Sequence, residues 1–389
     1  MAERIEMVCW RDLIDHAVDY LGASPSGEAR RDARRASLEA LRDLASAGEW
    51  HYYYDRWRLN LVGAYLSGTV DYDHTGGASE RLLTLTGGVW PAWAAFGTVV
   101  MDNIPYEVAS RLSDTALTLT ENANPGADLI GEPYHIYRDT YPLPCYFQSV
   151  GSVILVNHMI TLLPEHPNAW LERQRVFRGT SMPRTYTVRG DPQYMNTLSL
   201  SFFPAPDIAY QVDMVYRRRP RPMLVDEYST GTVSTTPGSA VVAGSGTAWT
   251  SRLGGTVFRI GMDPTKPVTG KPGPNGPALE RQVVSVDSPT QLTLDDVAED
   301  NLSRAQYLMS DPADVETGAM YSALLRGIEA QMAKSRRMQD RAQAEGEYVK
   351  ALIRALEADS RSFAEEQGGT TRRPWPVRLR DMPISGDVS

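Results

Sequence analysis

The chain has 389 residues, 42% of them hydrophobic, and a formal net charge of −9. This length and apolar content are enough for a substantial core shared among two or three domains. The negative charge argues against a protein that holds bulk nucleic acid by charge attraction, but it does not exclude one past which DNA slides.

Two features bear on where the protein is made. Cys9 and Cys145 are its only cysteines, too few for a disulfide framework, which favours folding in a reducing compartment. The first six residues lack a basic region followed by an apolar run, so no secretory signal is expected. No stretch approaches the roughly 20 apolar residues of a membrane helix. We therefore expect a soluble protein without a membrane partner, made in the cytoplasm.

The N-terminal region, residues 1–64, is predicted to be a helical hairpin. Apolar residues recur at helical spacing over residues 10–21, and Gly22 supplies a stop. A second helix opens at residues 24–26 and runs to about Ala47, with Leu38, Leu41 and Leu44 on one side. We expect this hairpin to pack against a helix from the C-terminal end.

Two distant segments are predicted to be copies of one small β unit, at residues 65–129 and 228–309. Each begins with Gly-Thr-Val, passes through a tryptophan (Trp90 or Trp249) and a second Gly-Thr-Val, and closes on Leu-Thr-Leu. An internal repeat of this kind constrains the architecture more strongly than any single residue. The closing segments align without a gap and share Val108/Val283, Ser110/Ser285, Ser113/Ser288, Thr115/Thr290, Leu117/Leu292, Thr118/Thr293 and Leu119/Leu294.

Residues 130–227, between the two copies, are predicted to form an antiparallel β core. The apolar run 147–163 fits either a helix or a strand. Residues 183–188, 198–203 and 210–216 read as three strands joined by Gly/Pro/Asp turns, which predicts a meander. The second β unit then follows as an insertion, with an exposed loop at residues 264–277.

The C-terminal region, residues 310–366, is predicted to be a long helix or a helix pair. Asp311 suits the N-cap and Pro312 the first helical position. A helix over residues 314–360 would span roughly 70 Å at 1.5 Å per residue, although a polar middle at residues 334–341 and Gly346 could bend or split it. The expected fold class is α+β: a bundle of the N-terminal hairpin and this helix, with an antiparallel β core and two small inserted β units.

The sequence offers no recognisable reactive site. The six histidines show no metal-binding spacing, and Gly270-Lys271 is followed by Pro272, where a phosphate loop needs Ser or Thr. Acidic pairs such as Asp295-Asp296 are typical of solvated strand ends. We therefore predict no catalytic residue, no metal ligand, no cofactor and no enzymatic activity; a cell-wall hydrolase is the least favoured class.

Two arginine-rich segments are candidates for binding partners. The run at the end of the last core strand suits phosphate or an acidic partner, or is simply a solvated terminus. The extended C-terminal tail, residues 367–389, places Trp375 between two prolines, and this apolar surface favours docking on another protein. The candidate residues are Arg217, Arg218, Arg219 and Arg221 in the run, and Arg372, Arg373, Trp375, Val377, Arg378, Leu379 and Arg380 in the tail.

The order of these segments resembles the head-to-tail adaptor, or connector, proteins of tailed bacteriophages, chiefly short-tailed ones. The resemblance covers most of the chain as patterns of ordinary residues. It is carried by the N-terminal hairpin, by Tyr137-Arg138-Asp139 with Tyr141 and Pro144, by Pro183-Arg184 with Tyr186, and by Phe203-Pro204 with Pro206-Asp207, Tyr210 and Tyr216. The second β unit also looks like a small insertion common in phage structural proteins.

What the resemblance implies is a structural virion protein at the head-tail junction, or neck. Members of this family form a ring, typically of about twelve copies, that continues the DNA channel below the portal and docks the tail. The expected partners are the portal protein, other copies of the chain, a tail or nozzle protein, and passing genomic DNA that is not read by sequence. The tail around Trp375 would clasp the portal or a neighbour. The alternative is a glycan- or receptor-facing tail component that uses the β units as binding faces.

Overall fold

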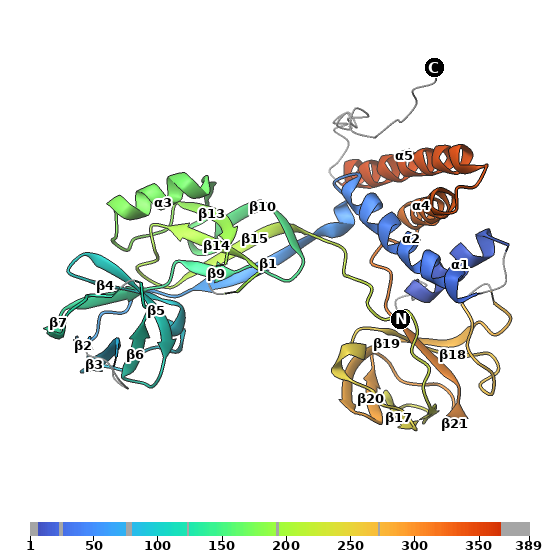
Figure 1. Cartoon of the computed structure of the whole chain (residues 1–389), viewed down its shortest axis with the longest axis horizontal. Coiled ribbons are helices and arrows are strands. Elements are labelled where there is room, and N and C mark those ends of the chain that lie inside the picture. The colour runs from blue at the N-terminus through green and yellow to red at the C-terminus, as the bar shows by residue number, and fades with distance from the viewer. Residues whose placement is uncertain are drawn as a thin grey trace, which may run out of the picture. The chain divides into compact units, whose positions relative to one another are not determined.

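The structure, a computed structural model, describes residues 7–22, 26–74, 80–122, 124–191, 194–270 and 273–366. Within these ranges the protein is mostly β, with 22 strands in four sheets and five α-helices, and 27% of it is helical (Figure 1). The predicted helical bundle with small β units is therefore wrong. Each repeat builds a complete seven-stranded sheet with its own core rather than a small insertion.

The chain divides into two compact units. The terminal unit comprises Met1–Tyr53 with Pro220–Ser389, and it holds four helices and the second copy of the repeat. The central unit, Tyr54–Arg219, holds the first copy and a two-layered β-sandwich. Residues 54–61, which the sequence placed in the N-terminal hairpin region, form a strand of the central unit.

The helices of the terminal unit pack around one apolar core. The two predicted N-terminal helices are confirmed, and Ser26 caps the second by accepting a hydrogen bond from the Ala29 amide at 3.2 Å. The second helix buries a stripe of alanines together with Leu41 and Leu44, and such small side chains let α4 approach closely. The helices are α1 (Trp10–Tyr20), α2 (Gly27–Ser46), α4 (Ala319–Ser335) and α5 (Arg341–Glu366).

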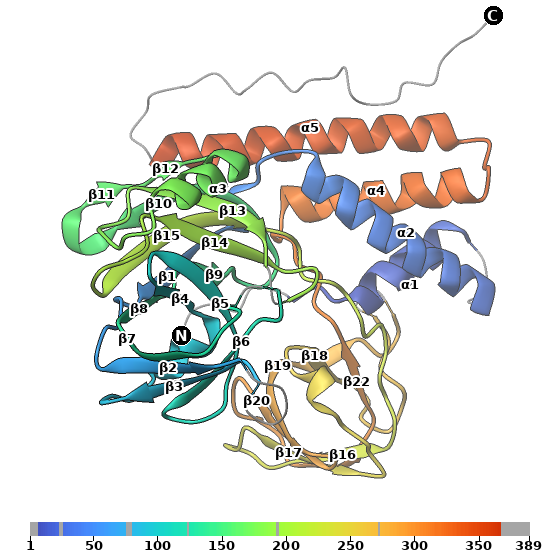
Figure 2. The ribbon, with the colours of Figure 1, turned by 60° about the vertical axis from the view of Figure 1, so that its left-hand side comes forward.

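Of the two alternatives predicted for the C-terminal region, a long helix or a helix pair, the structure has the pair. The polar segment between Ser335 and Arg341 separates α4 from α5, which lie side by side, whereas Gly346 lies inside α5 (Figure 2). The predicted N-cap is wrong, because α4 begins only at Ala319. The Asp311 carboxylate instead accepts hydrogen bonds from the backbone amides of Leu224 and Val225. A carboxylate satisfied by a distant loop is not available to begin a helix.

The predicted repeat is confirmed by the topology of the two barrel-like sheets. The strand order is β7-β2-β3-β6-β5-β4-β8 in the first barrel and β21-β16-β17-β20-β19-β18-β22 in the second, the same order position by position. The first barrel consists of β2 (Thr69–Asp73), β3 (Leu82–Thr86), β4 (Thr98–Met101), β5 (Ile104–Arg111), β6 (Ala116–Leu119), β7 (Leu129–Glu132) and β8 (Tyr134–Tyr137). The second consists of β16 (Thr232–Thr235), β17 (Val241–Ser245), β18 (Val257–Gly261), β19 (Pro277–Ser288), β20 (Gln291–Leu294), β21 (Leu302–Ala305) and β22 (Tyr307–Ser310).

The two barrels share an aromatic centre that the sequence alignment only partly found. Trp90 and Trp249 are buried in equivalent places, edge-on to Tyr134 and Tyr307 respectively. The second Gly-Thr-Val match, however, is displaced by one residue: Thr98 pairs with Glu107, but it is Val257 that pairs with the equivalent Gln282. Which residue of the strand faces inward is therefore set by the barrel core and not by the local sequence match.

The central unit also contains a sandwich of two four-stranded sheets around one apolar core. Residues 147–155 are a strand, which resolves the helix-or-strand ambiguity. One sheet is ordered β1-β15-β10-β11 and the other β12-β13-β14-β9. The strands are β1 (Tyr54–Leu61), β9 (Thr140–Pro142), β10 (Phe147–Leu155), β11 (Ile160–Thr161), β12 (Leu163–Pro164), β13 (Thr185–Gly190), β14 (Leu198–Phe203) and β15 (Tyr210–Arg218); α3 (Pro167–Val176) packs on β13.

The predicted three-stranded meander is therefore wrong at its last step. Strands β13 and β14 do form a hairpin, but β15 crosses to the opposite layer and pairs with β1 and β10. Alternation shows that one face of β15 is buried, and Val212 and Met214 are indeed in the core. It does not reveal which sheet holds the strand, because both layers bury their inner face against the same core.

Candidate functional site: charged networks and an exposed sheet face

The predicted arginine run is divided between the two units. Arg217 and Arg218 end β15 and Arg219 follows it in the central unit, whereas Arg221 belongs to the terminal unit, where its backbone amide donates to the Asp314 carboxylate at 2.8 Å. Along the strand, Arg217 lies opposite Tyr54 of β1, and the backbone amide of Arg219 donates to the Tyr146 carbonyl. The first three arginines of the run therefore belong to the central unit and the fourth to the terminal unit.

Arg217 also shares a sheet face with two arginines that the sequence analysis did not single out. Arg56 and Arg58 lie on β1 directly opposite Val215 and Asp213 of β15, and side chains paired in this way point to the same side of an antiparallel sheet. The alternation in residues 54–61, polar then apolar, was the available signal. We call this outward face of β1 and β15, with Arg56, Arg58, Asp213, Val215 and Arg217, the arginine face.

One carboxylate organises the arginine face. The Arg56 Nε lies 2.8 Å from both oxygens of Asp213, and the Arg58 Nε lies 3.7 Å from Oδ2. The hydrogen bond from Arg56 lowers the pKa of Asp213, which stays ionised at neutral pH. The side chains of Arg56 and Arg58 remain 59% and 60% exposed, so their guanidinium groups are held in place yet accessible.

The tail residues proposed as a clasp lie outside the described part of the chain. Arg372, Arg373, Trp375, Val377, Arg378, Leu379 and Arg380 all follow Glu366, where α5 ends. Their role therefore stays a prediction.

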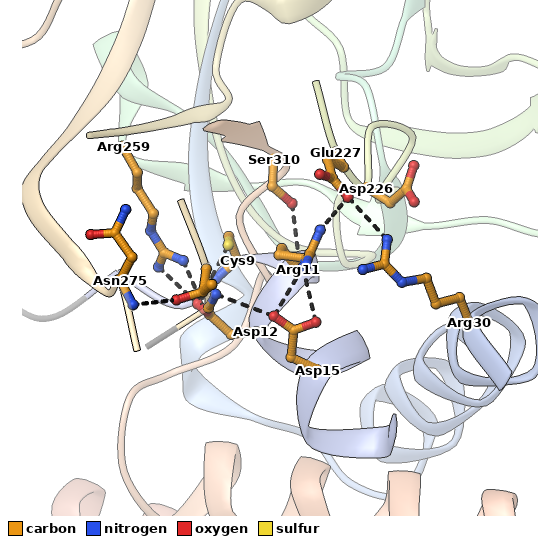
Figure 3. A network of polar contacts seen from close by, with 12 residues as sticks. Cys9, Arg11, Asp12, Asp15, Arg30, Asp226, Glu227, Arg259, Asn275 and Ser310 are labelled. Carbon is orange, nitrogen blue, oxygen red and sulfur yellow. Dashed lines mark hydrogen bonds and ion pairs between the residues drawn. The ribbon is translucent and has the colours of Figure 1, made fainter. Parts of the chain in front are cut away.

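A buried ionic network joins α1 to the second barrel within the terminal unit (Figure 3). The guanidinium of Arg259, on β18, is fully buried and donates to both oxygens of Asp12, each at 2.7 Å. Its Nε donates to Glu280 at 2.8 Å, and its Nη2 also donates to the Met7 carbonyl at 3.0 Å. Burial, the largest single influence, would lower the pKa of Arg259, but the hydrogen bonds with Asp12 together with the charges around the guanidinium, those of Asp12 and Glu280 among them, leave that pKa raised.

The same network determines the protonation state of the Cys9 thiol. Its thiol donates to Asp12 Oδ2 at 3.4 Å, and burial, helped by the charge of Asp12, raises the pKa of Cys9 to about 12. The thiol is therefore neutral and inert near neutral pH. A second branch lies beside it (Figure 3), in which Arg11 pairs with Asp15 and Glu227, and Arg30 reaches Glu227 at 3.4 Å.

A second polar layer lies in the sandwich beneath α3. Asp139 is 8% exposed and accepts from Gln174 Nε2 at 2.6 Å and from the Thr140 hydroxyl at 2.9 Å. Arg189 donates to Thr140 at 3.1 Å, and its guanidinium lies 4.8 Å from the ring centre of the buried Trp170. These contacts fix α3 on its sheet and leave each charged group satisfied, as expected of a structural layer.

The described residues hold no group of three or more His, Cys, Asp or Glu side chains placed to bind a metal ion. Within the same ranges, no helix is long and apolar enough to cross a membrane. Comparison with models of known protein families finds no match, and a search of curated proteins finds none either. The described residues present an exposed basic sheet face and internal ionic networks that hold the elements together.

The polar layer beneath α3 predicts a pH dependence of the free energy of unfolding. Burial raises the pKa of Asp139 above its ordinary value of 3.8. The folded state thus binds this proton more tightly than the unfolded chain, so the free energy of unfolding falls as pH rises from 3.8 through the raised pKa. We expect Asp139→Asn to remove this part of the pH dependence in denaturation titrations. Asp114→Asn, which changes an exposed carboxylate in the same unit, should leave this pH dependence unchanged. If Asp139→Asn did not alter the pH dependence of the free energy of unfolding, Asp139 would not be its source.

Proposed function

We propose that the protein is a structural adaptor of the neck of a tailed bacteriophage. The most direct test is whether it assembles into a ring beneath a portal. In this proposal the chain forms a closed ring, extends the DNA channel and docks a tail or nozzle protein, without catalysis. DNA passes without being read by sequence. Two observations support the proposal: the sequence resemblance, and the exposed arginine face, which is suited to protein contacts.

The observation that carries the proposal is the way the helical layer ends. Both ends of the chain contribute to one core, with α1 and α2 packed against α4 and α5. Directly after α5, the sequence continues with 23 residues that include four arginines and Trp375 between two prolines. A rigid layer followed by a basic segment with one large aromatic anchor suits a protein that clasps another subunit.

The alternative, a glycan-binding tail component, gains no support from the tryptophans of the two repeats. It requires aromatic side chains on the surfaces of the barrels, where they can stack on sugar rings. Trp90 and Trp249 are instead 1% and 2% exposed and belong to the barrel cores. We therefore do not propose the β repeats as glycan faces.

Removing the tail tests the adaptor proposal. A chain ending at Glu366 should keep its fold, because the helical core is built from residues before that point. It should lose stable attachment to portal particles, measured by co-sedimentation and by electron microscopy of the mixture. A full-length Trp375→Ala variant serves as the finer test, since loss of a buried aromatic anchor commonly costs 2 kcal/mol or more, roughly thirtyfold in affinity.

Two controls make that result specific. Circular dichroism of the truncated chain must match the full-length protein, which separates lost binding from lost folding. Mutating Arg35, an exposed arginine on α2, to Ala should leave attachment unchanged. If the truncated chain attaches as well as the intact one, the tail is not the clasp.

A further inference from the structure

Charge is unevenly divided within the central unit. The sandwich segments, residues 54–64 and 138–219, contain eleven arginines, no lysine and seven carboxylates, a net charge of +4. The first-barrel segment, residues 65–137, contains nine carboxylates and two arginines, a net charge of −7. A chain with a net charge of −9 thus carries one basic and one acidic body in the same unit.

The arginine face is where the sandwich presents its positive charge on a regular surface. Among the described residues of β1 and β15, Asp213 is the one carboxylate that points outward with these arginines, and it is shared by Arg56 and Arg58. Two guanidinium groups on a single carboxylate leave positive charge uncompensated at the surface. Both arginines stay more than half exposed, and among the described residues their one ion-pair partner is Asp213.

The acidic counterpart lies along strands β2 and β7 of the first barrel. Asp71 accepts from the Gly131 amide and Asp128 from the His74 amide, each at 2.7 Å, which holds both carboxylates at this edge. Asp73 lies two residues after Asp71 on β2 and therefore on the same face of the strand. We call this surface, with Asp71, Asp73, Asp128 and Ile130, the acidic edge.

Both surfaces also carry an exposed aliphatic side chain. Val215 in the arginine face is 40% exposed, and Ile130 in the acidic edge is 86% exposed. A contact that buries aliphatic groups within a charged rim is the usual anatomy of a protein interface. Nucleic acid would need the arginines but would gain nothing from these apolar side chains.

We propose that the arginine face of one copy binds the acidic edge of the first barrel of a second copy. Because two different surfaces of the chain meet, the contact is head-to-tail, the type that closes into a ring. The inference therefore rests on the proposed function and names the surfaces that would form its ring. Charge complementarity supplies the orientation and the rate of association, and the apolar groups supply the buried centre.

Charge reversal and its rescue test this pairing. Arg56→Glu/Arg58→Glu should weaken assembly of the full chain by more than about tenfold in the concentration at which rings form, measured by mass photometry with and without portal. Adding Asp73→Arg and Asp128→Arg should restore it, because these changes reverse the charge of the acidic edge in the same way. Arg175→Glu, on α3 over the opposite layer, is the matched control.

The outcomes separate this inference from the proposed function. If the wild-type chain forms rings and the Arg56→Glu/Arg58→Glu variant forms them equally well, the pairing is wrong and the adaptor proposal stands. If the wild-type chain never self-associates, alone or on portal, both are overturned. If the variant keeps its rings but loses affinity for a 30-base-pair DNA duplex in fluorescence anisotropy, the arginine face binds phosphate and not a second copy. Circular dichroism excludes misfolding of the variants.

Discussion

Replacing Arg259 by methionine is expected to destabilise the terminal unit by about 3–5 kcal/mol, because it leaves the carboxylates of Asp12 and Glu280 without their shared cation. Asp12 is 5% exposed and its oxygens face the guanidinium from inside the fold. A loss of this size is a large fraction of the stability of a typical domain. Chemical denaturation followed by circular dichroism and hydrogen exchange in α1 and β18 would measure it.

The control is an arginine whose ion pair is exposed. Arg35 pairs with Glu39 at 2.7 Å on the surface of α2, and Arg35→Met should leave the denaturation midpoint unchanged. A double variant, Arg259→Met with Asp12→Leu, should lose less than the sum of the single changes, since the removed partner is no longer a buried unpaired charge. Equal effects of Arg259→Met and Arg35→Met would show that the network contributes nothing to stability.

The sequence revealed features that depend on local pattern. The repeat was visible because seven aligned residues of each closing segment recur, and three of the pairs, Val108/Val283, Leu117/Leu292 and Leu119/Leu294, lie in the barrel cores. The helices α1 and α2 followed from apolar spacing and from the Ser26 cap. Such signals survive because burial and capping act on neighbours within a few residues.

Features that depend on distant partners were missed. The layer to which β15 belongs is set by β1, more than 140 residues earlier in the chain. Aspartate is a common helix-capping residue, but the Asp311 carboxylate accepts hydrogen bonds from the backbone amides of residues 224 and 225 instead. Arg259 sits on a strand whose other residues are apolar, and only the fold brings Asp12 to it. The arginine face was missed likewise, because β1 and β15 each contribute only part of it.

The buried tryptophans of the two barrels provide the second large effect. Trp90→Ala and Trp249→Ala should each cost about 3–5 kcal/mol in the barrel concerned, since each removes a side chain that is at most 2% exposed. The two barrels lie in different units, so a single global transition would not separate them. Hydrogen exchange should therefore show faster opening in β5 and β6 for the first variant and in β19 and β20 for the second.

Replacing each tryptophan by phenylalanine distinguishes the two copies. The Trp249 Nε1 donates to the Tyr307 hydroxyl at 3.0 Å, whereas the buried Trp90 Nε1 has no hydrogen-bond partner among the described residues. Trp249→Phe thus removes a hydrogen bond as well as volume, while Trp90→Phe removes volume together with a donor that was already unsatisfied. We expect Trp249→Phe to be more destabilising by about 1 kcal/mol. Equal losses would mean that the aromatic centres hold the two barrels by packing alone, and that the polar contact to Tyr307 adds nothing.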